Sequence, residues 1–333
     1  MSSDSLQQQQ PVHPAQRRTT LLLRWSTWII VGCLVALTPA SVQGQYAAGD
    51  PEVLGGELAG PGEYLDLDWY LAQGGELGPS EPWSLQLLPE GIIYKPYLAS
   101  TKESRLAATI VSTTKQGTNW DATLGGRIGL ARLGTENEVL PEGWQLDVEG
   151  SAQVRLNLSE NVDVQSVDFR AGLPLTYGVG PHRMKFAYYH LSAHIGDEYL
   201  FANPGTPRQN FARDALVLGY ARYFSPEFRA YGEMGWAFYS IESEPWEFQF
   251  GVDYSPSMAT GFQGSPFFGV NGHLRQELDY SGTLSVQAGW AWRGDETGHL
   301  LRAGLQYYNG ASSQFAFYRR FEEQIGFGLW YDY

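Results

Sequence analysis

Cysteine, basic residues and long apolar runs are all scarce in this chain. The single cysteine, Cys33, lies near the N-terminus, so the rest of the chain offers neither a disulfide nor a thiol nucleophile. The 22 basic residues are outnumbered by 36 acidic ones, and the formal net charge is −14. This balance argues against nucleic acid as a partner, because phosphates favour basic surfaces. Beyond residue 44, no segment has the ~18 consecutive apolar residues that a transmembrane helix needs.

Residues 1–44 have the pattern of a targeting segment. A basic region containing Arg17 and Arg18 precedes a largely apolar run over 25–37, and small residues follow. We predict a secretory signal peptide over 1–44. Two alternatives are a twin-arginine signal and a lipidation signal at Cys33.

The next segment, 45–90, is acidic and rich in glycine and proline, with no lysine or arginine. We expect it to be a mostly irregular, flexible periplasmic segment. The alternative is a plug inside the lumen of a barrel.

The clearest pattern in the chain is a strict alternation of side chains over residues 144–158. Apolar or small residues occupy the even positions from Trp144 to Leu158, and the odd positions are all polar. Successive side chains point to opposite faces only in an extended strand. A membrane barrel strand needs ~9–11 tilted residues with an apolar outer face and a polar inner face. The segment therefore predicts a strand of a transmembrane β-barrel.

Similar patterns recur along the chain and predict thirteen strands. They span 91–99, 104–113, 119–131, 143–158, 162–174, 182–194, 210–224, 227–240, 246–256, 263–274, 279–293, 297–309 and 322–333. Bacterial single-chain barrels use even strand numbers, and Pro96 makes 91–99 the weakest candidate, since proline lacks a ladder donor. We therefore predict an all-β fold, a transmembrane antiparallel β-barrel of about 12 strands within 91–333.

The last predicted strand places Ile325, Phe327, Leu329, Tyr331 and Tyr333 on one face and ends on an aromatic residue. This ending resembles the C-terminal signal that the outer-membrane assembly machinery recognises. With the chain end on the periplasmic side, the longer segments 195–209 and 310–321 become external loops. We expect location in the bacterial outer membrane, with membrane lipids and that machinery as partners.

A His-x-Ser-x-His sequence in strand 182–194 is the strongest candidate for chemistry. His190, Ser192 and His194 share parity with Met184 and Phe186, so all three should face outward near the external end. Ester hydrolysis needs a hydroxyl nucleophile, a base and a group that orients the base.

These roles fit Ser192, His190 and Asn210, with Asp214 as the alternative orienting residue. Asp197 and Glu198 follow closely and are candidate calcium ligands, because calcium prefers carboxylate oxygens.

The His-x-Ser pair resembles that of outer-membrane phospholipase A, and more loosely that of the lipid A deacylases. In the phospholipase family a histidine base, a serine nucleophile and an asparagine on the next strand correspond to His190, Ser192 and Asn210. The phrases H-L-S-A-H-I-G-D-E-Y and I-G-F-G-L-W-Y-D-Y also resemble the family called domain of unknown function 1207. This second resemblance implies an outer-membrane protein without an assigned activity.

Two functions follow from these patterns. The first is a serine esterase, a phospholipase-like hydrolase acting on lipids of the outer leaflet. The alternative is a non-catalytic barrel, either a small-solute channel or a structural protein, in which inward charges such as Arg155, Arg183 and Arg302 fill the lumen.

Overall fold

The computed structural model describes residues 82–114, 117–136, 140–208, 210–295 and 297–333. All of them belong to Ala59–Tyr333, one of the two units into which the chain divides. The signal peptide predicted over 1–44 lies outside the described residues, as does the part of the predicted acidic segment that precedes residue 82.

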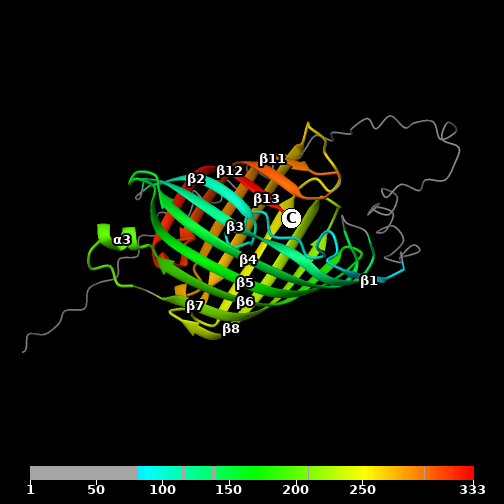
Figure 1. Ribbon diagram of the computed structural model, residues 1–333, viewed down its shortest axis with the longest axis horizontal. Helices are drawn as coiled ribbons and strands as arrows, with labels where there is room; N and C mark the ends of the chain where they lie inside the picture. The colour runs from blue at the N-terminus through cyan, green and yellow to red at the C-terminus, as the bar shows by residue number, and fades with distance from the viewer. Residues whose placement is uncertain (1–81, 115–116, 137–139, 209, 296) are drawn as a thin grey trace, which may run out of the picture. The chain divides into compact units, whose positions relative to one another are not determined.

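The described residues form one antiparallel sheet that closes on itself (Figure 1). Consecutive strands from β2 to β13 pair as neighbours, and β13 pairs with β2 to close the barrel. The strands are β1 Ser84–Leu87, β2 Leu106–Thr113, β3 Gly117–Gly134, β4 Gly143–Asn157, β5 Asp163–Val179, β6 His182–Ile195, β7 Phe211–Tyr223, β8 Phe228–Ile241, β9 Trp246–Tyr254, β10 Ser265–Arg275, β11 Gly282–Arg293, β12 Leu300–Ala311 and β13 Phe321–Asp332. The short helices are α3 Asp197–Ala202, η2 Gln276–Leu278 and η3 Phe315–Phe317. The closed barrel confirms the predicted fold class.

The outer face of the barrel is apolar on every strand from β2 to β13. Leu124, Leu305 and Ile325 are each 62 % exposed, and other large apolar side chains lie beside them around the wall. Soluble monomers rarely expose apolar patches larger than a few hundred Å². Because closure also pairs the strand edges, the barrel satisfies both requirements of a transmembrane fold. Separately, no described helix is long and apolar enough to cross a membrane.

The two ends of the barrel differ in their connections. One end carries the segment between β6 and β7, which contains α3, and the segment between β12 and β13, which contains η3. We call it the loop end. The opposite end carries the chain terminus Tyr333 and the tight turn between β5 and β6, and we call it the turn end.

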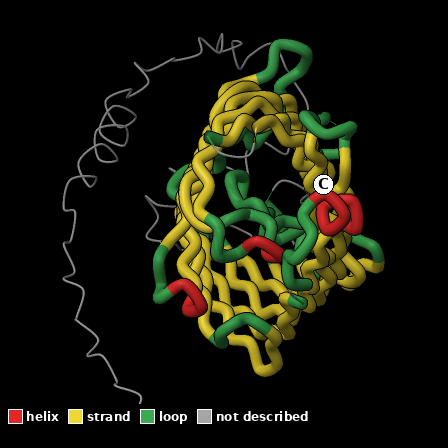
Figure 2. Tube along the Cα trace, turned by 90° about the vertical axis from the view of Figure 1, so that its left-hand side faces the viewer, coloured by secondary structure: helices red, strands yellow, loops and turns green. Residues whose placement is uncertain are grey.

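The edge of β3 opposite β4 pairs with two short strands, β1 and β2. Both β1 and β2 pair with β3, β1 at the turn end and β2 toward the loop end. Between them, residues 88–105 leave the wall and cross the interior, where Tyr97 stacks on Tyr231 with ring centroids 3.8 Å apart. We call residues 88–105 the plug segment. Figure 2, which looks along the barrel from the end that carries α3, shows loop segments inside the ring of strands.

The strand predicted over 91–99 is therefore wrong, and the barrel begins at Ser84 rather than at residue 91. Arginine side chains replace the missing ladder bonds of this segment. Arg105, Arg132, Arg229 and Arg302 donate to the carbonyl oxygens of Glu90, Gly91, Lys95, Pro96, Tyr97 and Leu98. A backbone whose carbonyls are satisfied this way can be buried without strand partners.

The segment between β12 and β13 covers the interior of the barrel at the loop end. We call residues 312–320 the capping loop. Phe315 is buried and lies 5.0 Å from the Phe211 ring, centroid to centroid. The buried carboxylate of Asp168 on β5 accepts the Phe315 N–H at 2.9 Å and pairs with the ammonium of Lys102 in the plug segment. The plug segment and the capping loop therefore meet at Asp168.

Candidate active site

Strand β6 presents its even-numbered side chains to the outside of the barrel. Met184 and Phe186 are about half exposed on this face, whereas Arg183 is buried in the interior. His190, Ser192 and His194 continue the outward row toward the loop end. The pleat therefore places the three predicted residues where the sequence pattern predicted them.

The imidazole of His190 is oriented by Asp214 on β7. The two residues face each other in register, and His190 Nδ1 lies 2.9 Å from Asp214 Oδ1. The Tyr188 hydroxyl donates to the same oxygen at 2.6 Å. A carboxylate can only accept, so Nδ1 must carry the proton in this pair and Nε2 is left as the base. This arrangement has the base and the orienting group of a catalytic triad.

Ser192 lies next to His190 along the same face. Residues two apart on a strand have Cα atoms about 7 Å apart, and their side chains project in parallel. Ser192 is opposite Phe169 on β5 and Ala212 on β7. Its hydroxyl makes no hydrogen bond to any described residue.

Asn210 and His194 lie farther toward the loop end. Asn210 is exposed and directly precedes β7, and its side chain makes no hydrogen bond to a described residue. His194 is also exposed, with its ring 6.0 Å from the Phe169 ring. Of the two orienting residues weighed from the sequence, the structure brings Asp214 to His190.

The two predicted calcium ligands belong to α3. Asp197 pairs with Arg208 at 2.6 Å, so its carboxylate is already neutralised. Within the described ranges, no group of three or more His, Cys, Asp or Glu side chains could hold a metal ion. Asp197 and Glu198 therefore do not fit a calcium site.

The comparison with protein families is decisive for classification. The model of the family described as "Protein of unknown function (DUF1207)" matches residues 82–333. The chain belongs to the DUF1207 family. This match confirms the resemblance seen in the sequence and covers the whole described barrel. A search of the curated proteins found no match.

Solved structures similar to this DUF1207 chain include two phospholipases and a porin. Outer membrane phospholipase A from Escherichia coli is 10 % identical, with a TM-score of 0.46 over 71 % of this chain and 92 % of that one. The Salmonella typhi outer membrane phospholipase dimer with bound calcium is 12 % identical, with a TM-score of 0.47 over 71 % and 93 %. The KdgM porin in complex with disordered oligogalacturonate is 11 % identical, with a TM-score of 0.39 over 68 % and 99 %. These scores are below 0.5, so the likenesses carry no argument about activity.

Paired charges line the lumen of the DUF1207 barrel. Arg155, fully buried on β4, binds Asp121 at 2.7 Å and Glu322 at 2.8 Å. Lys185 on β6 pairs with Glu233 at 2.5 Å. Like the plug segment, these pairs lie inside the barrel.

Sequence reasoning missed Tyr188 and Asp168 in this DUF1207 chain. Tyr188 has the outward parity of His190, so a search for hydroxyls two residues from the histidine could have found it. Asp168 contacts the plug segment and the capping loop, both distant in sequence. No local pattern identifies such a residue.

Proposed function

We propose that this DUF1207 protein is an outer-membrane serine hydrolase that cleaves ester bonds of outer-leaflet lipids. Ser192 is the nucleophile, His190 the base and Asp214 the residue that orients the base. The observation that carries the proposal is the His190 Nδ1 to Asp214 Oδ1 contact of 2.9 Å beside a serine without a hydrogen-bond partner among the described residues.

The reaction proceeds in two acyl-transfer steps. Ser192 Oγ attacks the ester carbonyl carbon while His190 Nε2 takes the hydroxyl proton. The tetrahedral intermediate collapses, the alcohol leaves with the proton from His190, and an acyl-serine remains. Water, deprotonated by His190, then releases the fatty acid and regenerates Ser192.

His194 is assigned to the oxyanion. It is the next outward side chain beyond Ser192, is exposed, and has no hydrogen-bond partner among the described residues. An imidazole N–H aimed at the developing negative charge supplies the donor that acyl transfer requires.

The surroundings of the site support a lipid as substrate. His190 and Ser192 open onto the apolar outer wall, so an acyl ester can approach from within the membrane. Assigning the loop end to the cell exterior, as is usual for outer-membrane barrels with longer external loops, places the site at the outer leaflet. Membrane lipids and the outer-membrane assembly machinery are then the expected partners.

The test is release of fatty acid from phospholipid and from lipopolysaccharide by the folded protein in detergent, with and without calcium. Ser192→Ala and His190→Ala should each lower kcat about 10³-fold or more. Asp214→Ala should lower it less, and Asp214→Asn less again, because asparagine keeps an acceptor oxygen for Nδ1–H. His194→Phe should lower kcat about 10²-fold with little change in KM.

Two matched controls separate chemistry from general damage to the wall. Ser112→Ala removes an outward, exposed serine on β2 near the loop end. His182→Ala removes the histidine at the turn end of the same strand and face as His190. Both should keep full activity. No release by the folded wild type from either lipid, with or without calcium, contradicts the proposal.

A further inference from the structure

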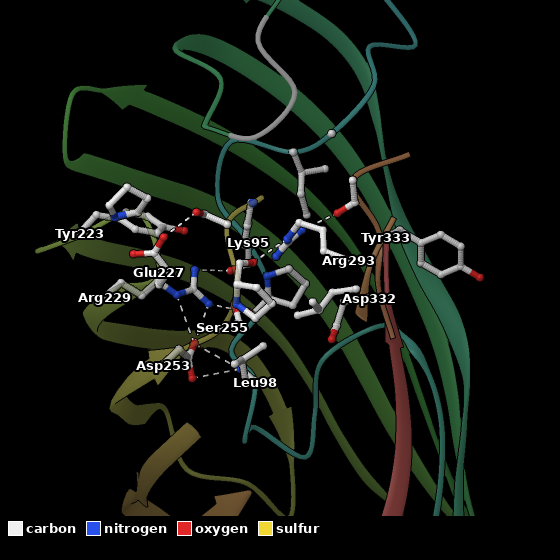
Figure 3. A pocket seen from close by; sticks show the side chains of 18 of the residues that line it. Lys95, Leu98, Tyr223, Glu227, Arg229, Asp253, Ser255, Arg293, Asp332 and Tyr333 are labelled. Carbon is white, nitrogen blue, oxygen red and sulfur yellow. Dashed lines mark hydrogen bonds and ion pairs between the residues drawn. The ribbon is translucent and has the colours of Figure 1, made fainter. Parts of the chain in front are cut away.

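A cavity of about 50 Å³ lies at the turn end of the barrel, between the plug segment and the connections of that end. Lys95 and Pro96 line it from the plug segment, and Tyr223, Ser255 and Arg293 line it from the wall and turns. Figure 3 shows Lys95, Tyr223, Ser255 and Arg293 around the cavity. A single water needs roughly 10–15 Å³, so the space holds several water-sized groups.

Lys95 is exceptional among the three lysines that the structure describes. Lys102 pairs with Asp168 and Lys185 pairs with Glu233, whereas no described carboxylate lies within ion-pair distance of the Lys95 ammonium. Burial, together with the neighbouring charges of Arg293, Arg229 and Arg183, holds the pKa of Lys95 well below its ordinary range. The electrostatic surroundings of this ammonium favour an anion.

Arg293 supplies a second donor to the cavity. Its Nε donates to the Pro256 carbonyl at 2.6 Å and its Nη1 to the Gly298 carbonyl. Its Nη2 makes no hydrogen bond to a described residue, and no described carboxylate pairs with the guanidinium. The hydroxyls of Tyr223 and Ser255 likewise make no side-chain hydrogen bond within the described ranges.

The acids that line the cavity already have partners. Asp253 binds Arg229 at 2.7 Å, and Asp332 binds Arg302 at 2.9 Å. Glu227 accepts hydrogen bonds from the hydroxyls of Ser225 and Ser257. Lys95 and Arg293, which form no ion pair with a described carboxylate, thus share a cavity with acids that already bind other groups.

We infer that this cavity binds a tetrahedral oxyanion, phosphate or a phosphate monoester, between the Lys95 ammonium and the Arg293 guanidinium. A tetrahedral oxyanion has four acceptor oxygens, which match the Lys95 ammonium, Arg293 Nη2 and the Tyr223 and Ser255 hydroxyls. Hydrogen bonds between cationic donors and phosphate oxygens are about twice as strong as neutral ones. The site faces the interior at the turn end and does not depend on the proposed hydrolase.

The test is titration calorimetry of the folded, full-length protein in detergent, with inorganic phosphate and glycerol phosphate as separate ligands. Lys95→Met should weaken phosphate binding at least tenfold, and Lys95→Arg should keep most of it. Arg208→Gln, which removes an exposed cation at the loop end, is the matched control and should bind like the wild type. Binding of inorganic phosphate alone indicates a free ion as the occupant, and equal binding of glycerol phosphate indicates a monoester; either result supports the site.

A second measurement on the wild type guards against a misfolded variant. Phosphate should raise the thermal unfolding midpoint relative to chloride at equal ionic strength, because a ligand of the native state stabilises it. The Lys95→Met protein should lose this difference. No heat and no midpoint shift with either phosphate, or unchanged phosphate binding by folded Lys95→Met, overturns the inference.

Discussion

The ion pair between Lys102 and Asp168 should be essential for holding the plug segment and the capping loop together. Both side chains are nearly excluded from solvent, with relative exposures of 8 % and 0 %. Asp168 also accepts the Phe315 N–H, and the Lys102 ammonium lies 4.5 Å from the centroid of the Phe315 ring. Removing one partner of a buried pair leaves an uncompensated charge and costs about 3–5 kcal/mol.

A double-mutant cycle measures this coupling. Asp168→Leu leaves the Lys102 ammonium without its ion-pair partner, and Lys102→Met leaves the Asp168 carboxylate without its partner. The double variant contains neither charged group, so no buried charge is left unpaired. It loses only the acceptor of the Phe315 N–H, which costs about 1–3 kcal/mol. We therefore expect the double variant to be at least about 3 kcal/mol more stable than the sum of the single losses predicts.

The assay is guanidinium unfolding in detergent, followed by tryptophan fluorescence. Arg208→Gln breaks an exposed pair and should cost less than about 1 kcal/mol. Asp168→Leu should also conduct more ions than the wild type in planar bilayers, because both closing segments lose their common anchor. Single losses that add to within about 0.5 kcal/mol refute the coupling, and a closed Asp168→Leu barrel refutes the anchoring role.

Three further predictions concern the wall, the lumen and one turn of the barrel. Gly125→Ala should destabilise the barrel, because a Cβ there would lie 2.3 Å from the Gly150 carbonyl oxygen, whereas Gly150→Ala meets nothing closer than 3.8 Å and should be neutral by the same unfolding assay. Arg155→Met leaves the lumenal carboxylates of Asp121 and Glu322 without their cation and should cost about 3–5 kcal/mol of unfolding free energy in the same assay. Burial lowers the pKa of His299, so the unfolded chain binds more protons near pH 6 and stability should fall as the pH drops below about 6.5. His299→Gln should flatten that dependence, measured as the unfolding midpoint against pH.

The strand pattern was readable from the sequence with few errors. Twelve of the thirteen predicted strands occur within a few residues of their predicted bounds, and 143–158 matches β4 almost residue for residue. The outward placement of His190 and Ser192 followed from the same alternation. Side-chain direction along a strand is a local property of the pleat, so a local pattern predicts it.

The orienting residue of the candidate site was not readable in the same way. Asn210, just before β7, and Asp214, on β7, have the same outward parity, and only the register between β6 and β7 decides which of them lies opposite His190. Register depends on the packing of whole strands and on the loop that joins them. The long segment between these strands left that register open.

The sequence by itself determined the barrel, its strands and the outward row of histidines and serine, because all of these depend on a period of two along one strand. Tertiary structure alone decided that residues 88–105 leave the wall, that Asp168 joins the plug segment to the capping loop, and that Lys95 lacks a carboxylate partner. These arrangements bring together residues that are far apart in sequence. They are set by the burial of charge inside a closed wall, where each buried ion must find a partner from another strand or bind a ligand.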